Sequence, residues 1–337
     1  MIGPGRRQHN TALFPACRLL LDLRAISTIR FPANVGSALH GGFGAALKSL
    51  VCVVKDTPCA QCRLYRSCAY PYLFETPPPL TTARMPKAQM IPRPYVLEPP
   101  QAEKSVYPAG ETLQVGLVLI GKAISYLPFF LEAFALMGRR GISQGTNRFS
   151  LERWRLYDAP GGPASVRLAG EEFAKATGGP ASAPLTGEAF AREHDSASCP
   201  VPLHRLKVQL LTPTRIEHAG QPVRRLDFPT FFSSLLRRLR NLQFFHYGLS
   251  DEEDDRRLRD LSQTITVATD RLIWLDQRRL SHGRWTPQGG LMGELSFQGD
   301  LTAYLQFLRL GELVHVGKGT TFGMGRYELV TEVKDSI

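Results

Sequence analysis

The predicted order of helices and strands repeats within this chain of 337 residues, and the repeat limits the fold more than any other feature. Hydrophobic periodicity predicts strand, helix, two strands, helix and strand in the first half, at 17–32, 34–52, 88–100, 111–123, 123–138 and 148–158. The same order follows in the second half, at 204–217, 227–248, 266–281, 289–300, 301–314 and 325–333. Two successive βαββαβ units are typical of ferredoxin-like domains. We therefore predict an α+β chain of two tandem ferredoxin-like domains, at 14–158 and 204–334.

The stretch between these domains, 159–203, is rich in Gly, Pro, Ala and Ser. This composition predicts a linker or a mobile excursion from the fold. The acidic run at 251–255 is expected to open a short, solvent-exposed helix that faces away from any polyanionic partner.

A glycine-rich loop, GKGTTFGMGRYEL at 317–329, precedes the last predicted strand. It does not fit a Walker loop, because the position five residues before Gly317 is Glu312 and the residue after Lys318 is Gly319. It does not fit a dinucleotide loop, because a strand follows it instead of a helix. The first half has a matching loop, RRGISQGTNRFSL at 139–151, which aligns at six positions. The loop is therefore interpreted as a duplicated part of the domain, although a plain turn is the alternative.

The formal net charge of the chain is +11, and most of the cationic residues are arginine. Arginine suits phosphate recognition and stacking on bases, so the charge favours a nucleic acid or another polyanion as partner. A high-GC genome is the alternative explanation. No apolar run reaches the 18 or so residues that a transmembrane helix needs, and the N-terminus lacks the apolar segment of a signal peptide. We expect a cytoplasmic protein that does not bind membranes.

Four cysteines, Cys52, Cys59, Cys62 and Cys68, lie within 17 residues as C-x6-C-x2-C-x5-C. Four thiolates at such spacing are typical of a tetrahedral zinc site. We therefore predict a structural zinc ion in an insertion at 52–68. An iron–sulfur cluster is the less favoured alternative, and an accidental grouping of cysteines is the third.

Several longer strings occur together in one known family. They are FPANVGSALHGGFGAALKSLVC, YPYLFE, LTPTRI, SSLLRRLRNL, LIWLDQRRLS, GGLMGEL and LVHVGKGTTFGMGRYEL. In this order they resemble the CRISPR-associated endoribonuclease of the RAMP superfamily, which cuts precursor CRISPR RNA at its repeats. The resemblance covers nearly the whole chain and is weakest in 76–110 and 159–203.

The resemblance implies two ferredoxin-like folds, cleavage without a metal or other catalytic cofactor, and a CRISPR repeat RNA hairpin as substrate. It also implies that the glycine-rich loop contacts RNA, and that other subunits of a CRISPR effector complex are partners. Two other functions are kept open. One is a catalytically inactive RAMP subunit that only binds crRNA, and the other is a zinc-containing module that binds DNA or protein.

RNA cleavage without a metal uses the 2′-hydroxyl as nucleophile, a general base, a general acid and a cation beside the phosphate. The products are a 2′,3′-cyclic phosphate and a 5′-hydroxyl. Histidine suits both proton transfers, and His40 in the predicted helix 34–52 stands where the family commonly carries its catalytic histidine. Lys48, two turns along that helix, and Arg30, just before it, are candidate cations. The resemblance implies an assisting tyrosine, but none lies near His40 in sequence.

The candidate RNA-binding residues come from both loops and from the helix at 227–248. They are Gly317, Lys318, Gly319, Gly323, Gly325 and Arg326, then Arg139, Arg140, Gln144, Asn147 and Arg148, and finally Arg237, Arg238 and Arg240. Consecutive backbone N–H groups in such loops make anion-binding concavities. Turn roles for the loop residues and a merely solvated helix face are the alternatives.

Overall fold

The computed structural model describes residues 14–82, 84–86, 88–100, 104–142, 146–156, 203–248, 255–281 and 284–330. The stretch predicted as a linker, 159–203, lies outside these ranges except for its last residue. Within them, no helix combines the length and the apolar character needed to cross a bilayer.

The N-terminal unit is built on a four-stranded antiparallel sheet with the strand order β3-β5-β1-β6. Its strands are β1 (Ala16–Ala25), β3 (Tyr95–Glu98), β5 (Thr112–Ile120) and β6 (Phe149–Leu156). Its helices are α1 (Val35–Val51) and α2 (Leu127–Arg140), the second preceded by the 3₁₀ helix η3 (Gly121–Tyr126). In chain order the four strands take places 4-1-3-2 across the sheet, read from β6, as in a ferredoxin-like fold.

The C-terminal unit repeats this plan with the strand order β10-β13-β7-β14, again antiparallel. Its strands are β7 (Arg205–Thr214), β10 (Thr266–Leu275), β13 (Gly290–Gln298) and β14 (Tyr327–Val330). Its main helices are α5 (Phe228–Tyr247) and α7 (Leu305–Val314), the second preceded by η4 (Thr302–Tyr304). The prediction of two tandem ferredoxin-like folds is confirmed.

The second unit differs from the prediction after β10. The single strand expected at 266–281 is interrupted, and its end forms a separate hairpin of β11 (Arg278–Ser281) and β12 (Arg284–Pro287). The hairpin base is closed by a backbone hydrogen bond of 2.7 Å from Gln288 N to Gln277 O. Two smaller pairs complete the strands, β2 (Ile29–Arg30) with β4 (Val106–Tyr107) and β8 (Glu217–His218) with β9 (Gln221–Pro222).

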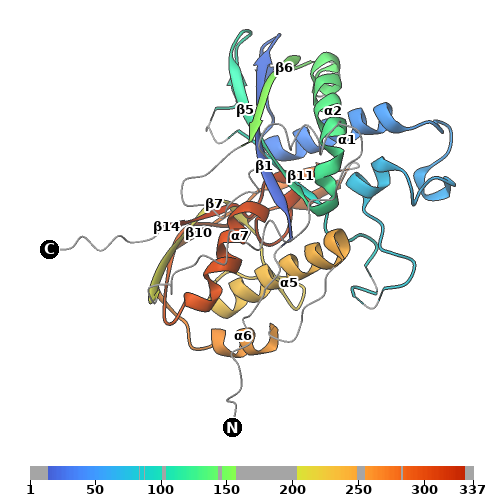
Figure 1. Cartoon of the computed structure of the whole chain (residues 1–337). Coiled ribbons are helices and arrows are strands. Elements are labelled where there is room, and N and C mark those ends of the chain that lie inside the picture. Colours follow the sequence, from blue (N-terminus) through green and yellow to red (C-terminus); the bar gives the residue numbers. More distant parts are fainter. Residues whose placement is uncertain are drawn as a thin grey trace.

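The two units share buried surface. One core lies between α1, α2 and their sheet, and includes Phe43, Phe130 and Phe134. The other lies under α5 and α7, and it also takes in Val96 and Val118 from the N-terminal sheet. That sheet is therefore buried on both faces at its end, which explains why β3 and most of β5 read as continuous apolar runs. Figure 1 shows the two units stacked, with the N-terminal sheet above α5.

The short helix predicted at the acidic run is α6 (Asp255–Ser262). Its first residue is not exposed as expected. Asp255 is 4% exposed and accepts a hydrogen bond of 2.8 Å from Nε of Arg240 on α5. This buried ion pair fastens α6 to α5, and the other residues of the run lie outside the described residues.

Candidate active site

His40 lies on α1, whose start is fixed by its N-cap. The side chain of Asn34 accepts a hydrogen bond of 3.0 Å from Ser37 N, which satisfies one of the free amides of the first turn. Leu39, Phe43 and Leu47, at helical spacing, are fully buried in the N-terminal core. His40 is on the neighbouring face and is only 6% exposed.

Glycines one turn before and one turn after His40 let other segments close over it. A Cβ at Gly36 would lie 1.8 Å from the carbonyl oxygen of Phe322, and a Cβ at Gly44 would lie 2.2 Å from the ring of Phe74. Positions i−4 and i+4 share one helix face. Gly36, His40 and Gly44 therefore form a stripe on which both phenylalanines pack.

The imidazole of His40 is enclosed by these aromatic rings. The ring of Phe74 stacks on it at a centroid distance of 4.5 Å, and the ring of Phe322 meets it edge-on at 4.7 Å. Phe74 belongs to η2 (Pro71–Glu75) of the N-terminal unit, and Phe322 to η5 (Thr320–Phe322) in the glycine-rich loop of the C-terminal unit. The site is therefore composed of both units.

A guanidinium covers each of the two phenylalanines. The guanidinium carbon of Arg93 lies 5.4 Å from the centre of Phe74, and that of Arg279 lies 4.6 Å from the centre of Phe322. Burial, with the charges of Arg93 and Arg279, lowers the pKa of His40 from 6.5 to about 3. His40 is therefore neutral at physiological pH, and its Nε2 atom is buried without a hydrogen-bond partner.

Polar contacts hold Arg93 and the base of the hairpin that carries Arg279. Nε of Arg93 donates to the carbonyl oxygen of Phe74. Arg279 lies on β11, at the base of the hairpin, and there the side chain of Asn34 donates to Oε1 of Gln288. The N-cap of α1 thus ties the hairpin to the helix that carries His40.

The ring of Tyr95 also lies beside the imidazole of His40. The ring centres are 6.3 Å apart and nearly parallel. Tyr95 is fully buried and its hydroxyl has no hydrogen-bond partner, while burial raises its pKa. Sequence reasoning missed Tyr95, Arg93 and Arg279, because all three are far from His40 along the chain.

Lys48 and Arg30, unlike Arg93 and Arg279, do not lie beside the aromatic rings that enclose His40. Lys48 is exposed and lies 5.6 Å from the centre of Tyr70, and eight helical residues separate it from His40 by about 12 Å of rise. Arg30 is exposed on β2, and its backbone N–H donates to Asn147. Both remain predictions as phosphate-binding residues rather than parts of the enclosed cluster.

The glycine-rich loop is not an open phosphate cradle. Its four glycines, Gly317, Gly319, Gly323 and Gly325, have φ values between 73° and 85°, which favour glycine over other residues. Gly323 and Gly325 are buried, and a Cβ at Gly323 would lie 2.3 Å from Cδ of Pro99 in the N-terminal unit. That these two glycines contact RNA stays a prediction, and in the free protein the loop that carries them is packed between the units.

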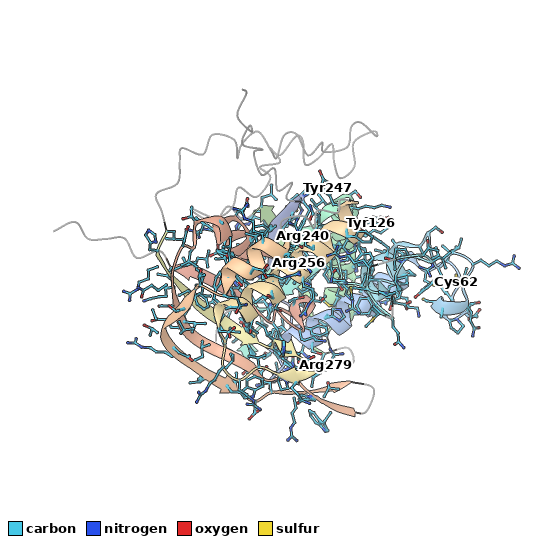
Figure 2. All side chains as sticks on the ribbon, turned by 90° about the horizontal axis from the view of Figure 1, so that it is seen from below. Cys62, Tyr126, Arg240, Tyr247, Arg256 and Arg279 are labelled. Atoms are coloured by element: carbon cyan, nitrogen blue, oxygen red, sulfur yellow. The ribbon has the colours of Figure 1, made fainter. Side chains whose placement is uncertain are left out.

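Four other candidate RNA-binding residues face inward in the free protein, and their role in RNA binding likewise stays a prediction. Arg326 is 7% exposed and lies 3.3 Å from Glu328. Arg240, labelled in Figure 2, is 4% exposed and pairs with Asp255. Arg238 donates to the carbonyl oxygen of Val314, and burial lowers its pKa to about 9. Asn147, at φ 60°, is buried and donates to the carbonyl oxygen of Ile142.

The remaining candidates lie at the surface. Exposed side chains are found at Arg139, Arg140, Arg148, Arg237 and Lys318. The exposed side chain of Lys318 lies 3.3 Å from Glu217, and Gly317 and Gly319 are partly exposed beside it. Gln144 lies outside the described residues.

The four cysteines line one common pocket together with Lys48, Tyr65 and Tyr70. All four are free thiols. In the described part of the chain, however, no group of three or more His, Cys, Asp or Glu side chains is placed to hold a metal ion. The thiols share a cavity but not a ligand cage, so the zinc prediction is not supported. Figure 2 shows Cys62 in a lobe well away from Arg279.

Two family models match the chain. A model described as an N-terminal domain matches residues 14–177, and the model of the CRISPR-associated endoribonuclease Cas6 matches residues 208–327. The C-terminal unit therefore carries a match to the Cas6 endoribonuclease model, and this agrees with the CRISPR RNA-processing endoribonuclease that the strings in the sequence indicated. Among curated proteins, no sequence matches it.

Solved Cas6 structures share the fold. A Cas6 product complex has a TM-score of 0.56 at 18% identity, over 94% of this chain and 100% of that one. Thermus thermophilus Cas6 has a TM-score of 0.51 at 17% identity, over 94% and 99%. A partial Cas6-RT-Cas1–Cas2 complex has a TM-score of 0.58 at 15% identity, over 97% of this chain and 48% of that one. At these identities the likeness concerns the arrangement of the two ferredoxin-like units.

Proposed function

We propose that this protein cleaves CRISPR repeat RNA without a metal ion, with His40 as its acid–base residue. One observation supports the proposal above all. The buried Nε2 atom of His40 has no partner, although the imidazole lies within the fields of Arg93 and Arg279. Buried polar atoms are normally hydrogen-bonded, so an unsatisfied one beside two cations suits an anionic ligand.

The low pKa of His40 sets its first role. A neutral imidazole accepts the proton of the 2′-hydroxyl as the 2′-oxygen attacks the adjacent phosphorus. The bond between phosphorus and the 5′-oxygen then breaks, and the imidazolium of His40 gives up the proton it accepted, so that the 5′-oxygen leaves as a hydroxyl. The products are a 2′,3′-cyclic phosphate and a 5′-hydroxyl. The phosphate charge raises the pKa of the imidazole once RNA is bound, which favours proton uptake.

Arg93 and Arg279 are proposed to stabilise the pentacovalent phosphorane. Its equatorial oxygens carry more negative charge than the starting phosphodiester, and guanidinium groups held ready at that position lower the barrier. One arginine comes from each unit. Cleavage therefore depends on how the two units meet, as well as on His40.

Substrate access requires movement at the same place. His40 is 6% exposed in the free protein, and its Nε2 must come within about 3 Å of a 2′-hydroxyl. Phe322 meets the imidazole edge-on from the opposite unit. Repeat RNA is therefore expected to shift the ring of Phe322 and insert its scissile phosphate between the two arginines.

The surface cations supply a separate, phosphate-binding role. Arg139, Arg140, Arg148, Arg237, Lys318, Lys48 and Arg30 are exposed and are proposed to contact the RNA backbone. Such contacts position a ligand without selecting its sequence. The finer partner proposal is that the protein keeps the 3′ hairpin of its product and joins a CRISPR effector complex. Co-elution of labelled product with the protein and those subunits on size exclusion tests it.

The cleavage test uses repeat RNA, EDTA and single-turnover conditions. We expect full cleavage in EDTA by the wild-type protein, and a loss of about 10²–10⁴-fold in His40→Ala. His218→Ala is the matched control, because His218 is an exposed histidine on β8. A substrate with 2′-deoxy sugar 5′ of the scissile phosphate should bind and stay intact. Full activity of His40→Ala, or tight binding by the wild type with no product, contradicts the mechanism.

A further inference from the structure

A buried charged contact joins the two units at a distance from His40. Glu98, at the end of β3, is 3% exposed, and His315, after α7, is fully buried. Their side chains are 3.0 Å apart, from Nε2 of His315 to Oε1 of Glu98. The other carboxylate oxygen accepts from Arg18 on β1 at 2.7 Å. Although burial opposes ionisation, the hydrogen bond from His315 and the charge of Arg18 bring the pKa of Glu98 to about 2.

The same histidine also closes the glycine-rich loop on itself. Nδ1 of His315 lies 3.0 Å from the carbonyl oxygen of Met324, nine residues later. The backbone of His315 has a φ of 64°, which is costly for a residue with a Cβ. Next to it, Val316 N donates to Gly325 O at 3.0 Å. One side chain thus fixes both ends of the loop and attaches the loop to the N-terminal unit.

The loop carries Phe322, and Phe322 connects to the candidate active site. Its carbonyl oxygen packs on Gly36 of α1, its ring edge meets His40, and its ring face supports the guanidinium of Arg279. The contacts therefore run without a break from Glu98 through His315 and the loop to Phe322. From there they reach His40 and Arg279.

We propose that Glu98 and His315 are positioning residues of the active site. They form an interdomain pair that holds the glycine-rich loop, and so keeps Phe322 and Arg279 against His40. The pair touches neither RNA nor the reacting atoms. Burial lowers the pKa of His315, so the pair is a hydrogen bond from His315 to a carboxylate, and its place beside the loop is consistent with a role in geometry. The catalytic part of the proposal rests on the proposed function.

The first experiment measures the pKa of His40 itself, in free protein, by NMR of labelled histidine. In the wild type His40 should not titrate above pH 5. In Glu98→Gln and in His315→Asn, the loop loses its attachment, so the pKa of His40 should move up toward 6.5 as Phe322 and Arg279 move away. Asp22→Asn is the matched control. Asp22 is a buried carboxylate in the same sheet, paired with Arg153 and Arg155, and its loss should leave His40 unchanged.

The second experiment separates positioning from stability and from RNA binding. At saturating repeat RNA, Glu98→Gln should lower the single-turnover rate constant about 10- to 100-fold, as misplacement of a reacting group does. The Kd for the 2′-deoxy substrate should change by less than about threefold, in line with a distant non-contacting residue. Glu98→Asp, which keeps the charge, should recover part of the rate.

Each result decides the proposal. An unshifted His40 pKa in folded Glu98→Gln and His315→Asn overturns it, even where cleavage falls. Unfolding of both variants while Asp22→Asn stays folded also overturns it, because the pair is then a stabilising element only. If the wild type does not cleave at all, the proposed function fails, but the NMR titration still tests the positioning pair.

Discussion

The two glycine-containing loops occupy the same place in the repeat and have different surroundings. Each follows the second helix of its unit and leads into the last strand. The C-terminal loop is packed between the units, with Gly323 against Pro99 and Phe322 against α1. In the described part of the N-terminal loop, Arg140 and Arg148 are exposed, and the buried side chain of Asn147 donates to Ile142 O and accepts from Arg30 N.

This difference separates two roles that sequence reasoning had joined. Glycine is needed in the C-terminal loop because its backbone has positive φ and a close neighbour. At Gly325 a Cβ would lie 1.8 Å from Val316 O. The C-terminal loop therefore shapes a protein interface, and RNA contact by the exposed arginines beside the N-terminal loop is a proposal. If the comparison holds, the C-terminal loop supports RNA cleavage, and the residues around the N-terminal loop bind the RNA backbone.

Apart from the loss expected in His40→Ala, the largest effect is expected at Arg279, which lies on Phe322 of the C-terminal loop, and at Arg93, which lies on Phe74. Arg279→Gln and Arg93→Gln should each lower the single-turnover cleavage rate about 10²–10³-fold, because each removes one preorganised cation from the phosphorane. Arg271→Gln is the control, since Arg271 is an exposed arginine on the neighbouring strand β10. Equal losses of cleavage rate in all three variants would mean that net charge causes the effect, and that Arg93 and Arg279 have no special role.

The next effect concerns the close approach of the loop to α1. Gly36→Ala places a Cβ 1.8 Å from Phe322 O, and such overpacking costs about 1–3 kcal/mol. Gly41→Ala lies on the same helix with no atom within 4 Å of its Cβ, and it should stabilise by up to about 1 kcal/mol through helix propensity. Urea unfolding of both variants gives the comparison. Destabilisation of similar size in the two would mean that the loop does not pack on α1 as described.

The pH dependence of stability should carry the signature of His40. Its pKa is about 3 in the folded protein and 6.5 as an ordinary histidine, so between these values only the unfolded state binds the proton. Stability from this group is complete above pH 6.5 and falls by about 1.4 kcal/mol per pH unit below it. His40→Leu should therefore be less acid-sensitive than the wild type, by about 2 kcal/mol at pH 5. If the free energy of unfolding changes with pH in the same way in both proteins, His40 is exposed to solvent instead of buried.

The repeat of elements was predictable from sequence because it depends on local periodicity. The alternation around β7 and the apolar spacing of α5 are properties of neighbouring residues, and they placed both ferredoxin-like folds. The interruption after Leu275 was not predictable in this way, because the four residues Arg278–Ser281 are too few to show a period of their own. Only the pairing of β11 with β12, instead of β13, distinguishes this segment from β10.

The candidate site was predictable in part, for a related reason. His40 stands out as a histidine between glycines, and those glycines at Gly36 and Gly44 were the signal that other chain segments approach there. The identity of those segments depends on tertiary contacts. Phe322 and Arg279 come from the second unit, and the buried partner of Arg240 comes from a different helix. Spacing along one helix cannot reveal which of its arginines are covered.

The smallest effect should separate the two loops by RNA affinity. Arg148, at the N-terminal loop, is exposed, whereas Lys318, on the C-terminal loop, has Glu217 at 3.3 Å. Arg148→Ala should weaken binding of uncleavable repeat RNA a few-fold and reduce the slope of log affinity against log salt by about 0.7–0.9, because one phosphate contact is lost. Lys318→Ala should change both less, since its charge is already partly neutralised within the protein. The cleavage rate at saturating RNA should stay the same in both variants. If Lys318→Ala loses more RNA affinity than Arg148→Ala, the glycine-rich loop binds the RNA backbone, and the roles proposed for the two loops are reversed.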